Sequence, residues 1–181
     1  MAWGIGLYQL NSNLTHSKIE GDLKAPAGIF SISCAFGFLS KSEMNNLKMD
    51  YVELNEFIEA VDDPLSNFYN QIVDNREVVI DWTSSEKMRE EPLYEMGLVI
   101  NHNFPNPKAG KGSAIFFHQW RNKNIGTAGC TAMSFNNLKK IIYWLEKNKN
   151  PALIQLPNSV YSELKSNWNL PDLITKEIQK K

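Results

Sequence analysis

One strong amphipathic helix, in a chain that otherwise has the patterns of strands and loops, is the feature that most constrains the fold. Ser134 is a good N-cap, and residues 135–145 place apolar side chains on one helical face. Asn150 and Pro151 end the helix. Because 181 residues suit one domain, the chain predicts a single α+β domain in which mixed β-sheets pack against a helix over residues 134–150.

The remaining segments divide into predicted strands and shorter predicted helices. Apolar runs rich in β-branched and aromatic residues, separated by glycine and proline, predict strands over residues 6–10, 27–38, 96–101, 113–118 and 152–156. Capping patterns or helical spacing predict helices over residues 66–74, 83–90, 158–166 and 171–181.

Charge and cysteine content exclude several classes of protein. Nineteen Lys and Arg residues against twenty Asp and Glu residues give a net charge of −1, so nucleic acid is not an expected partner. Two cysteines are too few for a disulfide-stapled scaffold. The longest apolar stretch, residues 27–39, is too short to span a membrane. The first four residues do not resemble a signal peptide, so we expect a cytosolic protein or a mature form without its leader.

The segment from Ile115 to Ser134 contains the candidate catalytic residues. Cys130 follows Gly129 and stands close before a helix start, where backbone N–H groups favour a thiolate. His118 lies twelve residues before Cys130, at the end of a predicted strand, and is the candidate base for nucleophilic catalysis. Gly129 lets a backbone N–H approach a developing oxyanion. The alternative is that Cys130 is only a small buried apolar residue, the role we expect for Cys34.

This segment resembles the L,D-transpeptidase catalytic domain, the YkuD-like family of bacterial cell-wall enzymes. The family signature is a His at a strand end, a variable loop and Ser/Thr-x-Gly-Cys, which maps here onto His118, Thr127, Gly129 and Cys130. The upstream segment at residues 20–30 is similar to the family's turn and strand, with Pro-x-Gly-x-Phe at positions 26, 28 and 30. The resemblance covers residues 19–156.

The chain also departs from the family pattern. Many members have His directly before Gly-Cys and Arg two residues after the Cys, where this chain has Ala128 and Ala132. It resembles a divergent branch that has Gly-Cys-Thr-Ala-Met at the nucleophile. Without that Arg, Arg121 and Lys123 are the available basic groups near the site. Trp120, beside His118, is the aromatic residue expected at the groove.

The resemblance implies a YkuD-like β-sandwich in which residues 1–157 are the catalytic domain and residues 158–181 are a helical extension of it. It implies that Cys130 attacks the carbonyl between an L-centre and a D-residue of a peptidoglycan stem peptide. His118 would be the base, and Gly129 would help to bind the oxyanion. Residues expected to bind substrate are Trp120, Thr127, Thr131 and Arg121.

The implied activity is either cross-linking by an L,D-transpeptidase or trimming by an L,D-carboxypeptidase, without cofactor or metal, in the periplasm or cell envelope. The sequence leaves the oligomeric state open. Two alternatives are a different Cys-dependent hydrolase and a non-catalytic wall-binding module of the same fold.

Other candidate residues are assigned structural or solvated roles. His102 is expected to satisfy a turn rather than line the groove, and His16 is expected to be solvated. A zinc site formed by His102, His118 and Cys130 is chemically possible, but the spacing matches no compact ligand motif. The acidic pairs at residues 62–63 and 90–91 are expected on a solvated surface.

Overall fold

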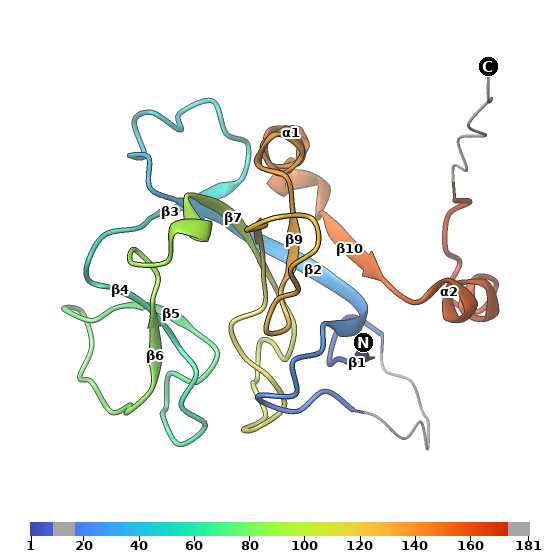
Figure 1. The fold of residues 1–181 in the computed structure, drawn as a ribbon, viewed down its shortest axis with the longest axis horizontal. Coiled ribbons are helices and arrows are strands. Elements are labelled where there is room, and N and C mark those ends of the chain that lie inside the picture. The colour runs from blue at the N-terminus through green and yellow to red at the C-terminus, as the bar shows by residue number, and fades with distance from the viewer. Residues whose placement is uncertain (9–16, 174–181) are drawn as a thin grey trace.

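The structure is a computed structural model that describes residues 1–8 and 17–173 (Figure 1). The chain is a single α+β domain with one seven-stranded sheet and one three-stranded sheet in those ranges. Its two α-helices there are α1 (Phe135–Trp144) and α2 (Asn158–Leu164). None of the helices in this part of the chain has the length and apolar character needed to cross a membrane.

The larger sheet is organised around β2 (Pro26–Gly37), a strand of 12 residues. Its first half pairs with β1 (Ala2–Trp3) and β10 (Ala152–Gln155), and its second half pairs with β3 (Asp50–Glu53) and β7 (Met96–Ile100). The sheet continues from β7 through an antiparallel β8 and then a parallel β9. The bounds of these two strands are Phe116–Gln119 and Thr131–Met133.

Two apolar clusters cover the two faces of the larger sheet, because successive side chains of a strand point to opposite faces. Phe117 belongs to the cluster that includes Leu138 and Ile142 of α1. Phe116, the preceding residue of β8, belongs to the other cluster with Met88 and Tyr94. The helix therefore packs on one face of the sheet, while segments around the smaller sheet cover the other.

The smaller sheet has the order β5-β4-β6 and lies beside β7 to β9 in Figure 1. Its strands are β5 (Ile72–Asp74), β4 (Ile58–Val61) and β6 (Ser85–Lys87). Glu59 of β4 is 1% exposed and accepts hydrogen bonds from Ser85, Lys87, Asn75 and Trp82. This buried carboxylate of β4 joins the three strands because Ser85 and Lys87 belong to β6, Asn75 directly follows β5 and Trp82 lies on the segment that leads to β6.

Two 3-10 helices complete the described architecture. The 3-10 helix η1 (Pro92–Tyr94) leads from the smaller sheet into β7, and Glu91 caps it by accepting a hydrogen bond from the Leu93 N–H. The 3-10 helix η2 (Lys147–Lys149) follows α1. It precedes β10, the strand that returns the chain to β2.

Several predicted elements are confirmed. Strands occur within or close to the ranges 27–38, 96–101, 113–118 and 152–156. The helix predicted over 134–150 begins as expected after Ser134, but it ends at Trp144 and is followed by η2. The predicted helix at 158–166 corresponds to α2.

Two predicted helices are wrong. Residues 66–71 form turns and β5 begins at Ile72, whereas residues 85–87 are β6. The predicted N-cap Thr83 instead donates its N–H and hydroxyl to Asp63, and Ser85 binds Glu59 at 2.5 Å. These long-range bonds stabilise an extended segment over the local helical preference.

Two further predictions fall partly on residues that the structure does not describe. For the strand predicted at 6–10, residues 6–8 form a bend, and residues 9–10 lie outside the described ranges. For the helix predicted at 171–181, residues 171–173 are not helical, and residues 174–181 lie outside the described ranges. His16 also lies outside them.

Candidate active site

His118 and Cys130 are brought together by the parallel pairing of β8 with β9. In this ladder Phe117 lies opposite Thr131 and His118 lies opposite Ala132. Cys130 is two residues before Ala132, so the alternation of side chains directs both toward the face that carries His118. The two candidate catalytic side chains therefore share one face although a loop separates them in sequence.

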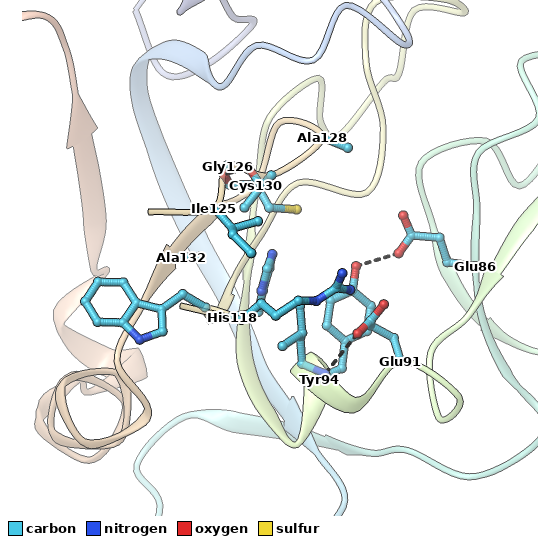
Figure 2. A pocket seen from close by; sticks show the side chains of 13 residues that line it. Glu86, Glu91, Tyr94, His118, Ile125, Gly126, Ala128, Cys130 and Ala132 are labelled. Carbon is cyan, nitrogen blue, oxygen red and sulfur yellow. Dashed lines mark hydrogen bonds between the residues drawn. The ribbon is translucent and has the colours of Figure 1, made fainter. Parts of the chain in front are cut away.

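Both side chains line a cavity of about 290 Å³ (Figure 2). One wall comes from β8, β9 and the loop between them, and its members include His118, Trp120, Arg121, Thr127, Cys130 and Ala132. The opposite wall comes from the segment between β6 and η1, and its members include Glu86, Glu91 and Tyr94. The cavity thus lies between the edge of the larger sheet and the region of the smaller one.

His118 is oriented for the role of a base. It is 5% exposed, and its Nδ1 lies 2.7 Å from the carbonyl oxygen of Gln119. Because a carbonyl oxygen only accepts, Nδ1 carries the proton and Nε2 keeps its lone pair. Burial lowers the pKa of His118, although the Gln119 carbonyl opposes this effect. The imidazole is therefore neutral at pH 7, and its edge-to-face contact with Tyr94, at 5.5 Å between centroids, fixes the ring.

Cys130 is held in a protonated state in this structure. Its thiol donates to the carbonyl of Ala114 at 3.4 Å and accepts from the N–H of Phe116 at 3.3 Å. Burial raises the pKa of the Cys130 thiol to about 12, despite the Phe116 bond. This contradicts the expectation that the turn favours a thiolate. Within the described ranges no hydrogen bond joins Cys130 to His118, so the thiol must leave Ala114 and Phe116 before transferring its proton.

The turn before Cys130 depends on Gly129 and Thr127. Gly129 has φ +147°, and a Cβ there would lie 3.3 Å from the carbonyl oxygen of Lys24. The Thr127 hydroxyl donates to the carbonyl of Cys130 at 2.5 Å and accepts from the N–H of Gly129 at 3.3 Å. The Gly129 N–H is therefore already bonded, whereas that of Cys130 has no partner among residues 1–8 and 17–173. Of these two donors, the Cys130 N–H is the one open to an oxyanion.

The residues predicted to bind substrate separate into two groups. Trp120, Arg121 and Thr127 line the cavity with His118. Thr131 does not, because it is adjacent to Cys130 in the chain and points to the opposite face of the sheet. Its hydroxyl donates to the side chain of Gln155 at 2.5 Å.

The opposite wall of the cavity contains residues that sequence analysis missed. Glu86 is half-buried and accepts a hydrogen bond from the Tyr94 hydroxyl at 2.6 Å. The acidic pairs were expected on a solvated surface, which is wrong for Asp63, whereas Glu90 is exposed and Asp62 and Glu91 are partly exposed. Asp63 is 6% exposed and accepts from the Thr83 N–H at 2.7 Å, while Asp62 and Glu91 line cavities beside Cys130. No local signal marks these residues, because only strand pairing brings them to the site.

His102 and Cys34 lie in positions that serve the fold. His102 is buried; its Nδ1 accepts from the Ile5 N–H at 3.2 Å, and its Nε2 donates to the Lys111 carbonyl at 2.8 Å. Cys34 lies in β2, where burial raises the pKa of its thiol. In the part of the chain that the structure describes, no three His, Cys, Asp or Glu residues gather in an arrangement suited to a metal ion.

No protein-family model, curated protein or solved structure matches this chain.

Proposed function

We propose that this protein is a cysteine acyltransferase of the YkuD-like L,D-transpeptidase type, acting on peptidoglycan stem peptides at the cell envelope. The observation that carries the proposal is the convergence of His118 and Cys130 on one cavity from adjacent parallel strands. A base with its Nε2 lone pair free and a nucleophile on the same face are the two groups that acyl transfer through a thioester requires. The motif similarity at residues 20–30 and 118–130 supplies the substrate class.

In the proposed reaction Cys130 first leaves its bonds to Ala114 and Phe116 and gives its proton to Nε2 of His118. The sulfur attacks the carbonyl between an L-centre and a D-residue, and the Cys130 N–H donates to the oxyanion. The C–N bond breaks, and the departing amine takes the proton from His118. A thioester on Cys130 remains. Attack by an amine then gives a cross-link, whereas attack by water gives a trimmed peptide.

A direct test is to incubate the protein with a disaccharide tetrapeptide and to record the masses of both protein and products. We expect an acyl adduct on Cys130 and loss of the terminal D-residue from the donor. Cys130→Ala abolishes both, whereas the matched control Cys34→Ala retains them. Turnover that persists in Cys130→Ala would overturn the proposal.

A non-catalytic wall-binding module is the second candidate. The raised pKa of Cys130 and the lack of a bond to His118 in the described structure favour it. The two candidates differ in one result, since a binding module retains the tetrapeptide without an acyl adduct and without product. The same mass measurement, combined with a binding titration, separates them.

A further inference from the structure

We propose that Glu86 determines the specificity for the second substrate, by binding the ammonium group of an amine acceptor beside the Cys130 thioester. This inference rests on the proposed function, and it assigns the protein to the cross-linking activity rather than to trimming.

Glu86 lies where two cavities meet at the nucleophile. The second cavity, of about 170 Å³, lies on the side of Cys130 that faces Lys18, Glu20, Asp62 and Ser113. Glu86, Ala128 and Cys130 line both cavities. A donor peptide in the first cavity, with His118 and Trp120, therefore leaves the second cavity open to another molecule. A group bound at Glu86 lies beside the sulfur that carries the acyl chain.

The carboxylate of Glu86 is held in place by Tyr94. The Tyr94 hydroxyl donates to Oε2 of Glu86 at 2.6 Å, and the Tyr94 ring contacts the ring of His118 edge to face. Tyr94 is itself 5% exposed, so this chain of contacts fixes the carboxylate relative to the base. Figure 2 shows the Glu86 side chain directed toward Tyr94 across from Cys130. Among the described residues, Tyr94 is the only hydrogen-bond partner of the Glu86 carboxylate.

The second cavity carries an excess of negative charge. Its lining includes the carboxylates of Glu20, Asp62 and Glu86 against one basic residue, Lys18. Lys18 is already paired with Asp22 at 2.5 Å, and no ion pair of the described chain involves the three lining carboxylates.

One residue that lines this cavity, Asp62, has an incompletely satisfied carboxylate. Oδ1 of Asp62 is buried without a hydrogen-bond partner within the described ranges. Burial raises the pKa of Glu86, the hydrogen bond from Tyr94 opposes this, and repulsion from Asp62 and Glu91 adds to the increase. A carboxylate that lacks a cationic partner and part of its hydrogen bonding is unfavourable, and a cation bound in this cavity would offset the charge of Asp62 and Glu86. Because these carboxylates do not form a metal-binding group, a primary ammonium, with three N–H donors, fits the site better than a metal ion.

In the proposed transfer step, Glu86 and His118 account for every proton that moves. The bound ammonium gives one proton to Glu86 and becomes a free amine, which attacks the thioester carbonyl. A C–N bond forms and the C–S bond breaks. The second proton of the nitrogen passes through His118 to the departing sulfur, which restores the Cys130 thiol. Glu86 then releases its proton to solvent.

The test compares two acceptors on the same acylated enzyme. Full-length protein is acylated with the tetrapeptide donor and mixed either with a stem peptide bearing a primary ammonium or with hydroxylamine, which is uncharged at pH 7. In Glu86→Gln we expect the ratio of stem-peptide transfer to hydroxylamine transfer to fall about tenfold, through a higher KM for the stem peptide. Glutamine still accepts from Tyr94, so the fold is retained. The matched control is Glu90→Gln, an exposed carboxylate shortly after β6.

Asp62→Asn provides a second, independent variant, and we expect it to lower the same ratio. If the wild-type protein is acylated and both variants keep the ratio of the Glu90→Gln control, Glu86 does not bind the acceptor and the inference is wrong. If the wild-type protein is never acylated, the proposed function itself fails. The two failures are therefore distinguishable in one experiment.

Discussion

Ala132 lies directly opposite His118 in the parallel ladder between β8 and β9. Both residues line the cavity at Cys130, so the small side chain of Ala132 leaves space beside the base. Trp120 and Arg121 border the same space, so under the proposed function they are the side chains placed to contact a substrate there.

The first prediction concerns Trp120. Trp120→Ala should raise KM or lower kcat/KM for the stem peptide, because a half-buried indole at the cavity provides apolar contact along the peptide. Steady-state kinetics and the rate of Cys130 alkylation by a small reagent are measured together, and the alkylation rate should change little. A large fall in Tm with unaltered kinetics at low temperature would instead identify Trp120 as a packing residue.

The second prediction concerns the free thiol. Because burial raises the pKa of Cys130 to about 12, the thiolate is scarce at pH 7 and is lost further as pH falls. Cys130 in the Cys34→Ala protein should therefore react with iodoacetamide at least about tenfold more slowly than free cysteine. The rate should rise steadily between pH 7 and pH 10. Alkylation faster than that of free cysteine would show that the thiol is activated before substrate binds.

The third prediction concerns the base. His118→Ala should lower the rate of acylation by about 10²–10⁴-fold, the usual contribution of a positioned acid–base group. Since burial lowers the pKa of His118 below 6.5, the base is neutral above that pKa and becomes protonated below it. The acid limb of the kcat/KM profile should therefore lie below pH 6.5. Activity that disappears with a chelator and returns with zinc would require a metal role for His118.

The fourth prediction concerns the stability of the smaller sheet. Burial disfavours the charge of Glu59, but hydrogen bonds from Lys87, Ser85 and Asn75 outweigh it and lower the pKa of Glu59 to about 2. Glu59→Gln should therefore reduce the free energy of unfolding by about 2–3 kcal/mol at pH 7.

The pH dependence of that loss has a definite sign. A carboxylate whose pKa is lower in the folded state contributes fully above its unfolded pKa, and the contribution disappears as pH falls through the folded pKa. The difference between wild type and Glu59→Gln in urea unfolding should therefore shrink between pH 4.5 and pH 2. The exposed Glu77→Gln is the control. A difference that stays constant over this range would contradict an electrostatic origin.

The sequence by itself determined those parts of the protein that depend on local pattern. The run at 27–38, rich in aromatic and β-branched residues, formed a strand that is buried along most of its length. The run after Ser134 formed a helix because its apolar residues share one face that packs on the sheet. The glycine before Cys130 and the position of His118 were also visible as local features. These features predicted that the two residues act together, but the pairing of β8 with β9 places them at one cavity, and the features did not reveal the protonated state of the thiol.

The tertiary structure alone decided the opposite wall of the site and the face that each residue presents. Residues 83–90 contain a helix-start pattern, yet the bonds of Thr83 to Asp63 and of Ser85 to Glu59 favour the extended strand β6 at residues 85–87, which brings Glu86 to the cavity at Cys130. Thr131 was excluded from the cavity by strand alternation in the ladder with β8. Both features depend on hydrogen-bond and strand-pairing partners that are distant in sequence, and no local sequence pattern indicates where such partners will lie.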